Sequence, residues 1–485
     1  MIRLIGNEFK KIFKKKTIYI LLFITLAYII LSNFIIKFNS NDFTYYYTGD
    51  IEYYENELKT LDPDNPNELP LYIEIKSQLE ISKLTNEYGG GNSWQAYIIN
   101  TDLSKDINTM VSHEYSDEIT DSVYQEAKQN YDTAIQKFKD NDWKYFANKA
   151  LDNVNKSLEE QYKLKESTKD TEALATINNT IANLEIEKQV NSWRLEKNIS
   201  YEYSFLNNAL TNYYSNKVNL LSYENKDINK LDEGELKDYN SSLEQASLNK
   251  YYIDNMITLK SGDNREILIN LFSNYELFIL IIGIVIAASI VSEEFSRGTI
   301  KLLLVKPYNR YKILLAKFIV CISILVLATV FIAISQFILG GLIQGFESLR
   351  IPVIEYNFET NKVETMNIAS YICLIGICKF PMYILLITLA FTCSTLFTNT
   401  ALAVSLPFLG YIAAPFINQI SLLYKIKQII YFVTPNWDLT QYLFGKTPTF
   451  SGITMPFSLA VCAIYLIIML ILSLVIFKKR DIKNI

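Results

Sequence analysis

The chain alternates between long apolar runs and one long polar segment. Six apolar runs, at residues 17–37, 274–292, 313–343, 368–397, 401–420 and 457–477, are each able to cross a bilayer as a helix, which takes about 20 residues. The third and fourth runs are longer than needed, so we expect them to tilt or to end in the interface. The pattern predicts an all-α, six-span polytopic membrane protein.

The polar segment, residues 39–266, lies between spans one and two and has few helix breakers. It has no proline after Pro70, and Gly234 is the only glycine between Asn92 and Ser261. Apolar residues recur every three or four positions, as expected for helices packed on helices. Two such stripes are Tyr124, Ala127, Tyr131, Ala134 and Phe138, and Leu174, Ile177, Ile181 and Leu184. The segment is therefore predicted to be a large helical domain inserted between the first two spans.

Charge is divided unevenly between the two parts of the chain and predicts their orientation. Residues 39–266 hold 23 Lys+Arg and 41 Asp+Glu, a balance of −18, while the rest holds 23 and 10, a balance of +13, which together give the net −5. Basic residues gather before span one, in the loop between spans two and three, and after span six. Because basic loops stay on the cytoplasmic side, both termini are predicted to be cytoplasmic and 39–266 extracellular. The predicted location is the cell membrane.

The first 16 residues and the stretch before span six each have an interfacial character. Ile2, Ile5, Phe9 and Phe13 lie at helical spacing beside lysines, which predicts an amphipathic helix on the inner membrane surface. The alternative is that these residues are only the cytoplasmic start of span one and that their lysines merely fix its orientation. In either case residues 1–38 form the first part of the chain, the N-terminal helix and span one. Residues 421–456 are rich in aromatic residues, and we expect short helices between Leu422 and Phe444 that dip toward the membrane and pack on protein.

Motifs for catalysis are missing from the sequence. There is no GxxxxGK[ST] phosphate loop, and His113 is the only histidine. HExxH, GxSxG and paired-cysteine motifs are also missing. We therefore expect no catalytic, metal or cofactor-binding residues in this chain, and no enzymatic activity of its own. Nucleic acid is not an expected partner.

The main sequence evidence for a function is the cytoplasmic loop 293–312. It belongs to the last part of the chain, residues 267–485, which holds spans two to six. Gly298 can break span two, Thr299 can cap a short helix over 299–305, and Pro307 ends it. A short rigid helix joined to two membrane spans can transmit a push from a docked partner. The alternative is an ordinary turn that carries positive-inside charges.

The same loop resembles a known family. The sequence SEEFSRGTIKLLLVKPYNRYKILLAK is similar to the loop between spans two and three of ABC type-2 exporter permeases, with the approximate pattern E-x-x-x-G-T-x-x-x-L-L-x-x-P-x-x-R. The residues that match the pattern are Glu294, Gly298, Thr299, Leu303, Leu304, Pro307 and Arg310. The six-span layout, the basic amphipathic start, the stretch YFVTPNW before span six and the basic tail resemble the family too, over residues 1–38 and 267–485.

The resemblance implies a two-plus-two assembly. Two permease copies, or this chain and a homologous permease, would join two ATP-binding subunits that carry the ATP and Mg²⁺, and the loop would hold the coupling helix. The residues implied to contact or position the ATPase are Glu294, Arg297, Gly298, Thr299, Lys301, Leu303, Leu304, Pro307 and Arg310. The 228-residue external segment departs from the family, which leaves the substrate open.

Polar residues inside apolar runs are further candidates, because the bilayer makes them expensive. Gln336, Asn418 and Gln419 could line a substrate path or could bond neighbouring helices. Lys379, early in span four, is interpreted as reaching the interface with its long side chain.

Two functions follow as expectations. The first is the permease subunit of an ATP-driven exporter, which moves a peptide- or lipid-like substrate and is powered by a separate ATPase. The alternative is a non-transporting membrane scaffold or sensor whose helical external domain binds a cell-envelope partner. The acidic surface of that domain fits either collection of a cationic peptide or a solvated surface that docks a partner.

Overall fold

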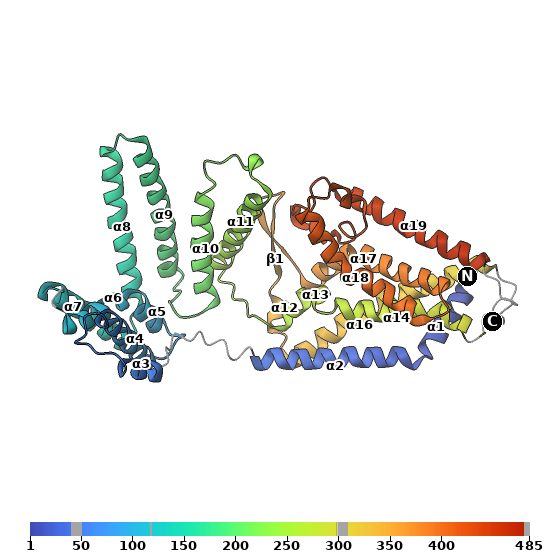
Figure 1. The fold of residues 1–485 in the computed structure, drawn as a ribbon, viewed down its shortest axis with the longest axis horizontal. Coiled ribbons are helices and arrows are strands. Elements are labelled where there is room, and N and C mark those ends of the chain that lie inside the picture. Colours follow the sequence, from blue (N-terminus) through green and yellow to red (C-terminus); the bar gives the residue numbers. More distant parts are fainter. Residues whose placement is uncertain (40–50, 117–118, 297, 299–308, 480–485) are drawn as a thin grey trace. The chain divides into compact units, whose positions relative to one another are not determined.

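The computed structural model describes the chain except for residues 40–50, 117–118, 297, 299–308 and 480–485, and the side chain of residue 39. The chain divides into two compact units (Figure 1). The membrane unit consists of Met1–Asn41 and Ser261–Ile485, and the helical unit consists of Asp42–Lys260.

The membrane unit contains the six helices that the sequence predicts as spans. They are long and apolar enough to cross a membrane: Lys16–Phe38 of α2, and Glu276–Ser296 (α14), Arg310–Gln344 (α16), Ile368–Leu396 (α17), Thr400–Leu423 (α18) and Met455–Lys479 (α19). α2 itself runs over Lys16–Asn39 and follows α1, Ile2–Phe13. The prediction of a mainly helical polytopic membrane protein is confirmed.

α14 is the central helix of this unit. In its most apolar stretch 67% of the residues are buried, against 17–39% in the other five helices. It packs against α2, α16, α17 and α18. The outer helices expose Leu, Ile and Phe side chains, as expected of surfaces that meet lipid rather than water. Among the six long helices that the structure describes in this unit, α14 therefore has the most protein around it.

Short elements cover the end of the bundle where α14 begins. They are α12 (Asn264–Ile269), α13 (Leu271–Asn274), the 3₁₀ helices η2 (Glu347–Arg350), η3 (Lys427–Tyr431) and η4 (Leu439–Gly445), and a hairpin of β1 (Val353–Asn357) and β2 (Lys362–Met366). The two strands pair antiparallel, with Val353 opposite Met366 and Asn357 opposite Lys362. The expected short helices between Leu422 and Phe444 are present as η3 and η4, and the hairpin is a small departure from an all-α fold.

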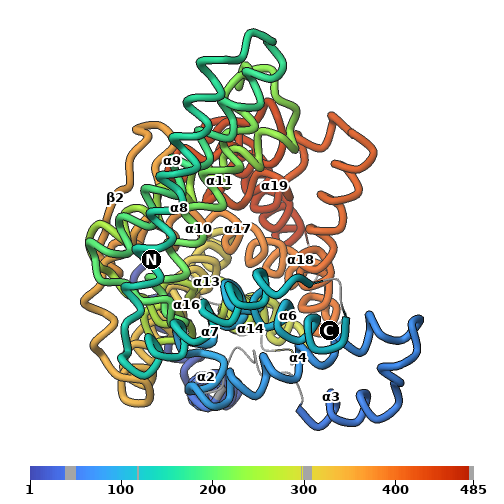
Figure 2. Tube along the Cα trace, turned by 90° about the vertical axis from the view of Figure 1, so that its left-hand side faces the viewer, coloured from blue at the N-terminus to red at the C-terminus, as the bar shows by residue number. Residues whose placement is uncertain are grey.

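The helical unit contains only helices among its described residues. They are α3 (Ile51–Leu58), α4 (Leu69–Glu87), α5 (Trp94–Asn100), α6 (Asp102–Tyr115), α7 (Asp121–Lys139), α8 (Trp143–Ser167), α9 (Thr171–Glu196), α10 (Phe205–Leu221), η1 (Ile228–Lys230) and α11 (Glu233–Asp254). α8 and α9 lie side by side in both views (Figures 1 and 2). Ile177 and Ile181 of α9 pack on Val154 and Leu158 of α8, as the apolar stripe predicts.

Candidate functional site

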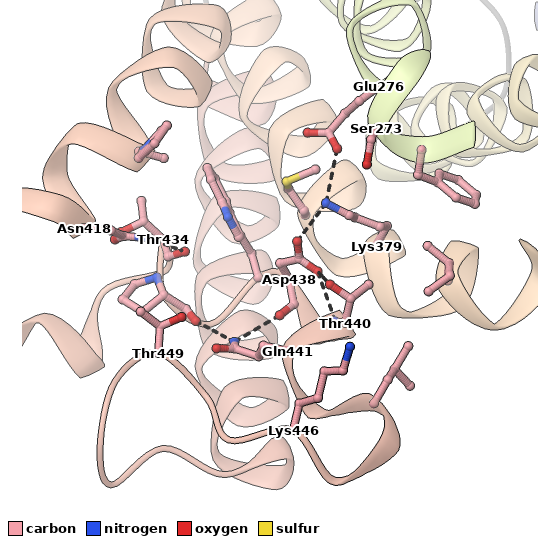
Figure 3. Close-up of a pocket in the computed structure, with 18 of the residues that line it drawn as sticks. Ser273, Glu276, Lys379, Asn418, Thr434, Asp438, Thr440, Gln441, Lys446 and Thr449 are labelled. Carbon is pink, nitrogen blue, oxygen red and sulfur yellow. Dashed lines mark hydrogen bonds and ion pairs between the residues drawn. The ribbon is translucent and has the colours of Figure 1, made fainter. Parts of the chain in front are cut away.

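A pocket opens at the end of the membrane bundle where α14 begins (Figure 3). Its volume is about 1000 Å³. The walls come from residues 269–276 up to the start of α14, the first half of α17, the second half of α18, Glu355 of β1 and the stretch from 434 to 450 that contains η4. A concave site of this size between helices of a bundle is large enough for a ligand bigger than an ion.

Prolines lie inside two of the helices that line the pocket. Pro415 lies inside α18 and lines the pocket, and Pro381 lies inside α17 two residues after Lys379. A proline inside a helix removes one backbone hydrogen bond and bends the helix, because its ring clashes with the carbonyl four residues earlier.

An ion network crosses the pocket at Lys379. The Lys379 ammonium lies 3.2 Å from a Glu276 carboxylate oxygen and 2.7 Å from an Asp438 carboxylate oxygen, and these contacts are drawn in Figure 3. The Tyr411 hydroxyl donates to the other Glu276 oxygen at 2.8 Å, and the Thr440 backbone N–H donates to Asp438. The network joins α17, α14, α18 and the segment before η4. Lys379 therefore has two carboxylate partners inside the protein, and the interpretation that its side chain reaches the interface stays a prediction.

A second ion cluster lies at the opposite end of α14. The Lys317 ammonium of α16 is 2.8 Å from Glu8 of α1 and 2.8 Å from Glu294 of α14, and it donates to the Ile290 carbonyl at 3.1 Å. Lys11 of α1 bridges the same two carboxylates at 2.9 Å each. The Lys317 side chain is 0% exposed. We call Glu8, Lys11, Glu294 and Lys317 the loop-anchor cluster, because it ties α1 to the helices on both sides of loop 293–312.

The electrostatic environment of this cluster changes the pKa of Glu8 and of Lys11. Burial alone would raise the pKa of Glu8, but the Lys317 and Lys11 ammonium groups outweigh it and hold that pKa below its ordinary value of 4.5. Burial alone would lower the pKa of Lys11, but Glu294 and Glu8 outweigh it and raise that pKa above 10.5. Both shifts show that the charged forms are favoured in the folded protein.

These shifts predict that Glu8 and Lys11 hold α1 on the helix bundle over a broad range of pH. The Glu8 contribution is fully present above its unfolded pKa and is lost as pH falls through the folded pKa, below 4.5. The Lys11 contribution is present below its unfolded pKa and is lost as pH rises through the folded pKa, above 10.5. The difference in thermal unfolding midpoint between wild type and Glu8→Gln is therefore expected to be constant from about pH 5 to 10 and to shrink below pH 4.5. A difference that grows on acidification would contradict this assignment.

The structure places three of the predicted coupling residues. Glu294 belongs to the loop-anchor cluster, Gly298 has φ +69°, and the Arg310 guanidinium donates to the Lys478 carbonyl of α19 at 2.9 Å. A positive φ is a conformation that favours glycine. The other six lie outside the described residues: Arg297, Thr299, Lys301, Leu303, Leu304 and Pro307.

The three predicted path residues fall in two places. Asn418 and Gln419 line the pocket, where the Thr434 hydroxyl donates to Asn418 at 2.7 Å. Gln336 is 0% exposed, and it does not line the pocket. Its side chain forms hydrogen bonds with Asn33 of α2, Asn264 of α12 and Tyr275. Of the two roles considered for Gln336 from the sequence, these contacts match a bond between neighbouring helices.

Sequence reasoning missed the charged residues that the two ion sites depend on. They are Glu8, Lys317, Glu276 and Asp438. The signal was present for Lys317, because a lysine inside an apolar run needs a partner. In the described part of the chain, no group of three or more His, Cys, Asp or Glu side chains could hold a metal ion.

This chain is similar to one protein family and to two proteins of Bacillus subtilis, one of which is named a membrane protein. The family described as "Protein of unknown function (DUF2705)" matches residues 240–483. "Uncharacterized protein YhcI" of Bacillus subtilis (strain 168) is 33% identical over 245 residues, which cover 50% of this chain and 76% of the relative. "Uncharacterized membrane protein YdbK" of the same organism is 30% identical over 200 residues, which cover 41% and 76%. No solved structure matches.

These matches correct the resemblance to ABC type-2 exporter permeases. The matched family is DUF2705 and not a family of ABC permeases, so the family assignment made from the loop pattern was wrong. The pattern spans only residues 294–310, and a glycine, a proline and basic residues are what a turn between two spans also requires. The six apolar helices and the named membrane relative place the chain in a membrane. The chain belongs to the DUF2705 family.

Proposed function

We propose that this chain is the membrane subunit of an ATP-driven transport system that exports a peptide- or lipid-like substrate. A separate ATP-binding subunit would act on loop 293–312, and the pocket would receive the substrate. Both termini and this loop are cytoplasmic in the proposal, and the helical unit is extracellular. A second copy of this chain, or a homologous permease, would complete the assembly.

The observation that supports the proposal is that α14 joins the two ion sites. Glu276, its first residue, lies in the pocket, and Glu294 lies in the loop-anchor cluster. The two positions are 18 residues apart, about 27 Å along a helix. Because backbone hydrogen bonds make a helix rigid along its axis, α14 can shift as one body when the loop moves. Such a shift changes the Glu276–Lys379 distance directly.

Coupling of this kind needs the loop to be held at both ends. Glu294 and Arg310 lie near the two ends of the loop. Glu294 pairs with Lys317 of α16, and Arg310 donates to the Lys478 carbonyl of α19. A push on the loop is therefore passed to α1, α14, α16 and α19 together. Only two residues separate α1 from α2, so α2 receives the same displacement.

The test is whether an ATP-binding subunit depends on the loop. The full-length protein, tagged and solubilised from its native host, is expected to bring down an ATP-binding subunit. The double substitution Leu303→Asp and Leu304→Asp is expected to lower the recovered ATPase at least tenfold, about 1.4 kcal/mol, because two carboxylates oppose an apolar contact. The measurement is quantitative mass spectrometry with an ATPase assay of the eluate.

The matched control adds two carboxylates at the other end of the bundle. Thr447 and Ser451 are both exposed there, so Thr447→Asp with Ser451→Asp is expected to leave the ATPase recovery unchanged. Recovery of a cell-envelope partner without any ATP-binding subunit from the wild type would support the scaffold or sensor instead. Equal ATPase recovery from both double variants would also contradict the proposed role of the loop.

A further inference from the structure

The charges that line the pocket do not balance. Three carboxylates, Glu276, Glu355 and Asp438, face two lysines, Lys379 and Lys446, which leaves a balance of −1. Lys446 lies 3.8 Å from Glu355. Each lysine is thus already associated with a carboxylate, and the excess is negative.

Lys379 stands between two carboxylates that come from different elements. Glu276 belongs to α14 and Asp438 to the segment before η4, while Lys379 itself projects from α17. Its side chain is 17% exposed, and those of Glu276 and Asp438 are 13% and 33% exposed. Without a cation between them, two nearby carboxylates of low exposure would repel each other and lose solvation. The position between them is therefore a built site for a positive charge.

We propose that the pocket binds an ammonium or guanidinium group carried on an apolar body, such as a basic amphipathic peptide, and that Lys379 occupies the cation position until the ligand arrives. The ligand cation takes over Glu276 and Asp438. The balance of the pocket then changes from −1 to 0. This inference names the substrate class of the proposed transport site and rests on that function only for its meaning in transport, since binding can be measured without it.

An anion fits the same place poorly. A phosphate or carboxylate would have to take Lys379 away from two carboxylates, and it would raise the negative balance from −1 to −2. Like charges in a partly buried site cost several kcal/mol when they cannot be paired. The fixed charges therefore select cations and reject anions.

The walls of the pocket suit an apolar body with a positive end. Phe272, Tyr411, Trp437 and Phe450 contribute aromatic rings to the lining. Aromatic faces attract ammonium and guanidinium groups and bury the apolar chain that carries them. At about 1000 Å³ the cavity holds more than a single side chain.

The displaced Lys379 ammonium has an acceptor nearby. Tyr383 lies one helical turn further along α17, on the same face as Lys379. Its side chain is 2% exposed, and its hydroxyl has no hydrogen-bond partner among the described residues. A buried hydroxyl without a partner is costly, so a bond from Lys379 satisfies this hydroxyl and offsets part of the loss of the two carboxylates after the exchange.

The experiment compares peptides that differ only in charge. Acetyl-Phe-Arg-Phe-amide, its neutral citrulline analogue and acetyl-Phe-Glu-Phe-amide are titrated into the full-length protein in detergent by calorimetry. The arginine peptide is expected to bind at least tenfold more tightly than the other two. Asp438→Asn is expected to remove that preference, while the control Glu347→Gln, at an exposed residue outside the pocket, is expected to keep it.

Lys379→Met is expected to raise the affinity for the arginine peptide, whereas Asp438→Asn lowers it. This increase distinguishes the proposed cation site from an anion site. It removes the competing cation, so the arginine peptide is expected to bind about tenfold more tightly than to wild type. Equal binding of the arginine and citrulline peptides to wild type would overturn the proposal, and so would a preference for the glutamate peptide. These results need no ATPase, so a failure here is distinct from a failure of ATPase association. If Lys379→Met does not fold, the wild-type comparison and Asp438→Asn still decide.

Discussion

Replacing Lys317 with methionine is expected to lower the free energy of unfolding by about 3–5 kcal/mol, the usual cost of removing one partner from a buried ion pair. Lys317 is completely buried and lies 2.8 Å from both Glu8 and Glu294. Methionine fills a similar volume, so the loss comes from charge. Of the two lysines that bridge these carboxylates, only Lys11 then remains.

A second substitution tests whether charge is the cause. Lys317→Met combined with Glu8→Met leaves the Lys11–Glu294 pair at 2.9 Å, which is balanced. The double variant is therefore expected to recover most of the loss. Thermal unfolding of the detergent-solubilised protein measures both variants, and Lys362→Met, at an exposed residue of β2, serves as the control with an effect within about 0.5 kcal/mol. Additive losses in the double variant would contradict this explanation.

The helices could be predicted from the sequence because their signals are local. A run of about 20 apolar residues has few other ways to be buried, so the spans were found in place. The stripe through Ile177 and Ile181 likewise needs only a partner with the same period, which α8 supplies.

The ion sites could not be predicted because their partners are distant in the chain. Glu8 and Lys317 are 309 residues apart, and nothing in the period of either helix selects that pair. Lys379 in an apolar run requires some partner, but Glu276 and Asp438 are brought to it only by the packing of α14 and by the segment before η4. The family resemblance failed for a related reason, because the loop 293–312 is a short motif and short motifs recur in unrelated chains.

Gln336 provides the second prediction. Replacing it with leucine is expected to lower the free energy of unfolding by about 2–3 kcal/mol. The Tyr275 hydroxyl donates to Gln336 at 2.6 Å, and the Gln336 amide donates to Asn264 at 3.0 Å and to Asn33 at 3.2 Å. Leucine has a similar size but leaves three buried polar groups without this partner. A single hydrogen bond between membrane helices contributes little to stability. The expected loss of unfolding free energy is large because Gln336→Leu removes several such bonds at once.

Asn418→Leu is the matched control, because it makes the same change in polarity at a residue that lines the pocket. Asn418 accepts a bond from the Thr434 hydroxyl at 2.7 Å and donates a longer one to the Thr434 carbonyl at 3.4 Å, in a partly exposed place. The loss of these two bonds is expected to cost less than about 1 kcal/mol. Thermal unfolding midpoints of the two variants separate a residue that holds helices together from one that faces a ligand. A large loss for Gln336→Leu with little loss for Asn418→Leu would leave only Asn418 and Gln419 as path residues. An unchanged midpoint for Gln336→Leu would instead return Gln336 to the path, since a residue that costs nothing to remove is not holding α2, α12 and α16 together.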